Sequence, residues 1–88
     1  MRKNVLLRVN YPSGRKWMLT VEKDNLRVHT SWYEDGNIML KSVDNFITNE
    51  TVQISYYPNG NMCLREVCSG DDVISSENYN EDGTKVER

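Results

Sequence analysis

Apolar and polar residues alternate along most of this chain. In residues 52–57, Val52, Ile54 and Tyr56 fall on one side of an extended backbone, and the residues between them fall on the other side. Residues 28–33 alternate in the same way. Alternation with a period of two is typical of half-buried β-strands. No window of useful length has helical spacing, so we expect an all-β protein.

The alternating segments predict an antiparallel meander of about seven or eight short strands. We expect one face of the sheet to be apolar, with Leu40 and Leu64 continuing the face of Ile54, and the other face to be mixed. The stretch 44–51 is expected to be a short helical turn or a bulged loop. The strands are expected at roughly residues 3–11, 15–22, 26–33, 37–43, 50–57, 61–67 and 73–79.

Glycine returns at intervals of 22, 24 and 23 residues, and each time it closes a similar phrase. The phrases at residues 32–36 and 56–60 are the most alike, reading Trp-Tyr-Glu-Asp-Gly and Tyr-Tyr-Pro-Asn-Gly. A fixed period indicates that one supersecondary unit has been copied. Each phrase has the residues of a type I turn followed by a bulge, which requires a glycine with positive φ. The four structural turn glycines are therefore Gly14, Gly36, Gly60 and Gly83.

Each period has room for one β-hairpin, so residues 1–88 are expected to form a single domain of four hairpin repeats. The repeats are placed at about 5–27, 28–51, 52–74 and 75–88, with the last cut short. The apolar side chains on one face of such a sheet have to be shielded from water. The sheet can curl into an open barrel, or it can stay a single sheet and pair with a second copy as a homodimer.

The phrase aromatic-Tyr-x-Asn/Asp-Gly, at a period near 23 residues, resembles the MORN repeat and more closely its variant in small bacterial proteins. The resemblance implies a chain of β-hairpins. It also implies a protein-binding role, since some proteins of the variant family are antitoxins that pair with a toxin. The second strands at 37–43 and 61–67 are mostly apolar, where the family's are rich in Gly and Lys. That difference favours a more compact sheet than an elongated single layer.

Charge is distributed unevenly along the chain. The formal net charge of the 88 residues is −2, but residues 1–27 carry a net +5 and residues 28–88 a net −7. We expect one basic and one acidic end. This asymmetry is explained either by drift of solvated surface residues between repeats, or by steering of the protein toward a partner that has a basic patch.

The two cysteines, Cys63 and Cys68, are too few for a disulfide framework. The residues near Met1 contain no long apolar stretch, so we expect neither a signal peptide nor a membrane span. A cytoplasmic location with free thiols is the resulting expectation.

Catalytic and metal-binding patterns are absent from the sequence. The single histidine, His29, has no serine or cysteine partner at a suggestive spacing, and the paired carboxylates stand in turns, where Asp is favoured for local hydrogen bonding. Two cysteines without further ligands do not make a zinc site. We expect no enzyme activity, no metal and no cofactor.

The repeats and the acidic turns together predict a non-enzymatic protein-interaction module that binds and neutralises a partner protein. Such a module is an antitoxin, or a phage- or mobile-element-encoded inhibitor of a bacterial defence nuclease such as an anti-CRISPR protein. Tyr is enriched at protein interfaces, and acidic groups complement a nuclease's basic channel. The candidate protein-binding residues are Tyr33, Tyr57, Glu34, Asp35, Asp71, Asp72, Glu81 and Asp82.

A column of tyrosines supports two other interpretations. Tyr11, Tyr33 and Tyr57 occupy the same slot in three repeats, on the expected mixed face. Such a column can simply stabilise the hairpins by cross-strand packing. It can also stack bases, which makes a single-stranded nucleic-acid binder the alternative function. Nearby carboxylates and the negative net charge favour protein over nucleic acid. The alternative would use the three tyrosines with Arg8, Arg15 and Lys16, helped by Arg2 and Lys3.

Overall fold

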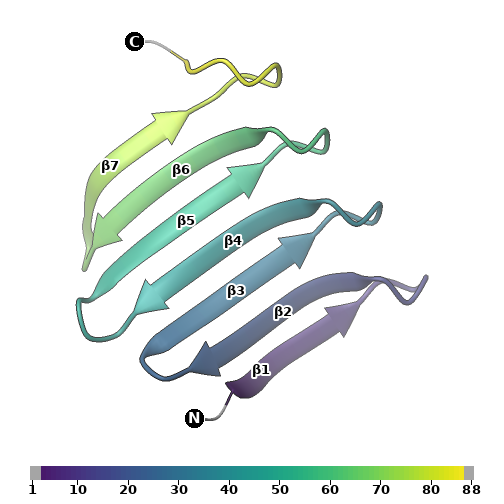
Figure 1. Ribbon diagram of the computed structural model, residues 1–88, viewed down its shortest axis with the longest axis horizontal. Helices are drawn as coiled ribbons and strands as arrows, with labels where there is room; N and C mark the ends of the chain where they lie inside the picture. The colour runs from purple at the N-terminus through teal and green to yellow at the C-terminus, as the bar shows by residue number, and fades with distance from the viewer. Residues whose placement is uncertain (1–2, 87–88) are drawn as a thin grey trace.

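A computed structural model describes residues 3–86, apart from the side chain of Lys3. Seven antiparallel strands form one sheet in chain order, and each strand pairs with the next (Figure 1). The predicted all-β meander is confirmed. The strands are β1 (Lys3–Asn10), β2 (Lys16–Lys23), β3 (Leu26–Trp32), β4 (Ile38–Asn45), β5 (Glu50–Tyr56), β6 (Met62–Ser69) and β7 (Asp72–Asn78).

The turns of the four glycine phrases all lie at one end of the strands, which we call the glycine-turn edge (Figure 1). In the turn of Gly36, the glycine N–H donates to the carbonyl of Tyr33 at 3.0 Å, and the Tyr33 N–H donates to the carbonyl of Asn37 at 2.8 Å. Gly36 has φ of 99°, and the other three phrase glycines have φ of 93°. The predicted type I turns with positive-φ glycines are confirmed.

The remaining turns lie at the opposite end and are less uniform. Asp24, in the turn from β2 to β3, has φ of 55°. Residues 46–49 join β4 to β5 as a loop, in which the Asn45 side chain accepts the N–H groups of Ile47 and Thr48 at 3.0 and 3.1 Å. The loop is shorter than the stretch expected from the sequence, because residues 44–45 and 50–51 belong to strands.

Cross-strand partners in an antiparallel sheet share a face, so the register sorts the side chains. One face, which we call the valine face, carries a row of six valines across six neighbouring strands. The other, the polar face, carries a parallel row of six polar residues. The valine row is Val5, Val21, Val28, Val43, Val52 and Val67, and the polar row is Thr20, His29, Ser42, Gln53, Glu66 and Ser76.

The expected placement of Leu40 and Leu64 is wrong. Leu40 pairs with Ser31 and Ser55, which puts it on the polar face, and Leu64 follows the same pattern in the next repeat. The cause is a register shift at the start of each second strand, where Trp32 pairs with residue 38 while Ser31 pairs with residue 40. One extra residue exchanges the faces of everything that follows it in the strand. The alternation of side chains within each strand was predicted correctly, but the face assigned to the second strand of each hairpin was not.

The sheet is a single open layer rather than a more compact arrangement. It measures 42 × 37 × 18 Å, and β1 and β7 form its two edges. None of the described apolar side chains is buried, and Ser31, at 6% exposure, is the one buried residue among those described. Most strand residues are half-buried, because each is shielded by its neighbours in the same row. The expectation of a compact sheet is therefore wrong. No helix in residues 3–86 is long and apolar enough to cross a membrane.

Candidate functional site

The tyrosine column is a set of hydrogen-bonded latches between repeats. The hydroxyl of Tyr33 crosses from one repeat to the next and donates to the carbonyl of Tyr56 at 2.8 Å. Tyr11 and Tyr57 do the same to the carbonyls of Trp32 and Tyr79, both at 2.7 Å. Each tyrosine is half-buried. A geometry repeated three times with these bond lengths supports the structural interpretation of the column.

Side chains also tie the turns of the glycine-turn edge to one another. Asn37 Nδ2 donates to the carbonyl of Pro58 at 2.9 Å, and Asn59 Nδ2 donates to the carbonyl of Glu81 at 2.8 Å. Arg15 makes a longer contact, 3.4 Å, with the carbonyl of Glu34. Exposed turns are ordinarily among the least ordered parts of a protein. Here the latches and these ties hold four turns as one preorganised edge.

The structure divides the candidate acidic residues between two ends of the sheet. Glu34 and Asp35 lie in the second turn of the glycine-turn edge, and Glu81 and Asp82 lie in the fourth. All four are exposed. Asp71 lies in the turn from β6 to β7 and Asp72 is the first residue of β7, so both are at the opposite end. One contiguous surface therefore cannot use the whole predicted set.

Two of these carboxylates already have a role inside their turns. Asp35 Oδ1 accepts the N–H of Asn37 at 2.9 Å. Asp82 Oδ1 accepts both the N–H and the hydroxyl of Thr84, at 2.9 and 2.6 Å, and these bonds hold the pKa of Asp82 below its usual range. Asp35 and Asp82 shape the turns, so Glu34 and Glu81 are the carboxylates best placed to meet a partner.

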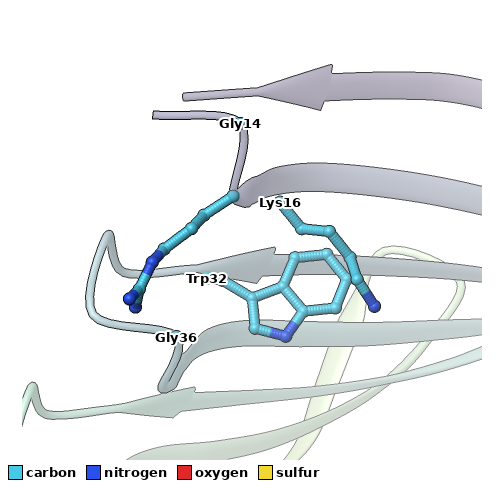
Figure 2. A pocket seen from close by; sticks show the side chains of 5 residues that line it. Gly14, Lys16, Trp32 and Gly36 are labelled. Carbon is cyan, nitrogen blue, oxygen red and sulfur yellow. The ribbon is translucent and has the colours of Figure 1, made fainter. Parts of the chain in front are cut away.

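Trp32 is a candidate site residue that the sequence reasoning missed. It lies at the glycine-turn end of the valine face, and Lys16 extends over its ring with Nζ 5.2 Å from the centroid (Figure 2). That distance is within the range of a cation–π contact. A hollow of about 440 Å³ opens beside the ring, and Gly14, Arg15, Lys16, Trp32 and Gly36 line it. Lys16 and Trp32 are far apart in sequence, so only the strand register brings them together.

Two of the predicted nucleic-acid-binding cations, Arg15 and Lys16, meet at this hollow. The third, Arg8, lines an adjoining hollow of about 410 Å³ together with Gly14 and Lys16. Tyr11 is nearby in the chain, but its ring stacks on Trp17 at 5.0 Å and its hydroxyl is taken by a backbone carbonyl. Arg2 lies outside the described residues, as does the side chain of Lys3.

The remaining reactive groups are held by local hydrogen bonds. His29 Nδ1 lies 2.7 Å from Thr20 Oγ1, and its Nε2 lies 3.2 Å from Ser31 Oγ. Burial and a contact with Glu66 raise the pKa of the Cys68 thiol, which keeps it protonated at neutral pH. Hydrogen bonding to Cys63, followed by burial, raises the pKa of Tyr57. In residues 3–86, no three His, Cys, Asp or Glu side chains cluster as a metal site would require.

Comparison with known proteins finds no match for the chain among protein-family models, curated proteins or solved structures.

Proposed function

We propose that this protein is a non-enzymatic interaction module that binds a partner protein through the glycine-turn edge and thereby neutralises it. The observation that supports this function is the preorganisation of that edge. Three tyrosine hydroxyls and the amides of Asn37 and Asn59 hold the turns in fixed positions before any partner arrives. A surface that is already ordered loses little conformational entropy on binding.

The charge of the edge supports a partner with a basic surface. Glu34 and Glu81 project from ordered turns, and Asp35 and Asp82 add negative potential next to them. Such an arrangement complements a basic protein surface, for example the nucleic-acid channel of a nuclease or toxin. Complementary potentials raise the association rate and select the partner, and salt weakens both effects. The resemblance to MORN-variant repeats is consistent with neutralisation as the result of binding.

The experiment compares two variants that carry the same change in charge at opposite ends of the sheet. Glu34→Lys/Glu81→Lys reverses two charges on the glycine-turn edge, and Asp71→Lys/Asp72→Lys reverses two at the other end. All four side chains are exposed, so we expect both variants to melt near the parent temperature. Tagged proteins are purified from the native host, and the proteins bound to each are quantified by mass spectrometry. The identified partner is then titrated with each variant in an assay of its own activity.

We expect a basic partner that the parent and the Asp71/Asp72 variant retain and inhibit, and that the Glu34/Glu81 variant loses. Loss of the partner from both variants would mean that net charge, rather than the edge, governs binding. Retention by both would place the interface elsewhere. A partner that binds without losing activity would exclude neutralisation.

A further inference from the structure

The strand register separates the charges of β1–β4 by face. Every cation of these strands with a described side chain, other than Arg27, lies on the valine face, and both carboxylates lie on the polar face. None of those valine-face cations has a carboxylate within 4 Å among the described residues. The net charge of −2 therefore conceals a strongly basic half-face. The cations are Arg8, Lys16, Lys23 and Lys41, and the carboxylates are Glu22 and Asp44.

The basic half-face is also hollowed. The hollow beside Trp32 and the hollow beside Arg8 share Gly14 and Lys16, so they adjoin. Each volume, about 440 and 410 Å³, is within the range of small-molecule sites. Lys41 lies in the same cross-strand row as Arg8, two strands beyond Leu19. Arg15 and Lys16 thus line the hollow of Trp32, Arg8 lines the adjoining hollow, and Lys41 lies on the same face of the sheet.

We propose that the basic half-face binds single-stranded nucleic acid. An unpaired base would stack on Trp32 in place of the Lys16 ammonium, which would then meet a phosphate, and Arg8, Arg15 and Lys41 would neutralise the neighbouring phosphates. Unpaired bases stack on exposed aromatic rings, and a basic groove follows the backbone. The bases of a duplex are already stacked on one another and are not free to stack on Trp32. An acidic peptide has negative charges, but it lacks the aromatic base that accompanies each phosphate of a nucleic-acid strand. The negative net charge weighs less against this ligand, because the two carboxylates of β1–β4, Glu22 and Asp44, face away from it.

This inference goes beyond the neutralising function, because it uses the cations and the Trp32 ring in place of the carboxylates of Glu34 and Glu81. The two sites meet at Arg15, which lines the hollow and also contacts the carbonyl of Glu34. A protein with both sites would bind a partner protein through Glu34 and Glu81 and a nucleic-acid strand through the Trp32 site. Either proposal can fail without the other.

The test uses Trp32 as its own reporter. The chain has two tryptophans, so Trp17→Phe leaves Trp32 as the single one and keeps an aromatic ring against Tyr11. Short oligothymidylate and oligouridylate are titrated into this protein while Trp32 fluorescence is recorded. We expect quenching on binding, with affinity falling as salt rises. Three or four phosphate contacts predict a log–log salt slope of about −2 to −3.

Two variants and one control locate the site, all in the Trp17→Phe protein. Arg15→Gln/Lys16→Gln removes two exposed cations and should lower the salt slope by about 1.4. Trp32→Leu should weaken binding about 5- to 150-fold, the range for loss of one stacked base, measured by anisotropy of a labelled strand. Arg27→Gln removes one charge from the polar face and should leave affinity and slope near those of the unsubstituted reporter. Circular dichroism checks that each variant is folded.

The proposal would be overturned if neither Trp32 fluorescence nor the anisotropy of the labelled strand changed at millimolar oligonucleotide concentration and low salt. Equal binding of the folded Arg15/Lys16 variant, a result that does not depend on Trp32→Leu folding, would overturn it as well. Equally tight binding of a duplex or of a poly-glutamate peptide would show that the face recognises charge alone, and would also overturn it.

Discussion

The most informative perturbation is the removal of the latch hydroxyls. Tyr33→Phe deletes one oxygen, which donates to the carbonyl of Tyr56 at 2.8 Å from a half-buried position. A hydrogen bond of this kind contributes about 0.5–1.5 kcal/mol net. Successive latches are separated by two strands, roughly 10 Å, which is far enough for their contributions to add. Changing Tyr11, Tyr33 and Tyr57 together should therefore lower the free energy of unfolding by about 3 kcal/mol.

Such a loss is large for a chain of 88 residues, because domains are stable by only about 0.05–0.15 kcal/mol per residue. The assay is urea unfolding followed by circular dichroism, and we expect the midpoint to fall while the slope with denaturant stays constant. Tyr56→Phe is the matched control, because Tyr56 contributes only its backbone carbonyl to the latch. The tyrosine hydroxyls do not stabilise the sheet in this way if the free energy of unfolding of the triple variant is within about 0.5 kcal/mol of the parent value, or if Tyr56→Phe costs as much as Tyr33→Phe.

Three further predictions follow from the geometry. Gly60→Ala should cost about 1–2 kcal/mol through backbone strain alone, since φ is 93° and no atom lies within 4 Å of the added methyl group; unchanged urea unfolding would contradict the turn. Val43→Ala should lower the free energy of unfolding by about 1 kcal/mol in the same assay, and Ser42→Ala should change it by less than about 0.5 kcal/mol. A larger loss for Ser42→Ala than for Val43→Ala would show that the two rows are assigned to the wrong faces. Lys85 lowers the pKa of Glu77 from 4.5, so this stabilisation is present above pH 4.5 and is lost as the pH falls through the lowered folded-state pKa. Melting temperatures from pH 7 to pH 3 should therefore fall less steeply in Glu77→Gln, and an unchanged slope would rule out this contribution.

The local sequence was sufficient for the strands and the glycine turns. Period-two alternation gave seven strands with ends mostly within two residues of those observed, because alternation depends only on neighbours along the chain. The positive φ of Gly36 and Gly60 followed from turn chemistry in the same way. Neither property needs information about distant residues. The order of the strands followed as well, since short turns force consecutive strands to pair.

The tertiary structure decided which residues share a face, and with that the candidate sites. A single extra residue at the start of β4 moves Leu40 to the face of Ser31, and the sequence does not mark where that bulge falls. Lys16 meets Trp32 only after the register of β1–β3 is set, and the Tyr33 hydroxyl finds its acceptor one full repeat away. Single-sequence patterns record the period of a strand but not its offset from the neighbouring strand. Each of these contacts depends on that offset, which is why it could be found only in the assembled sheet.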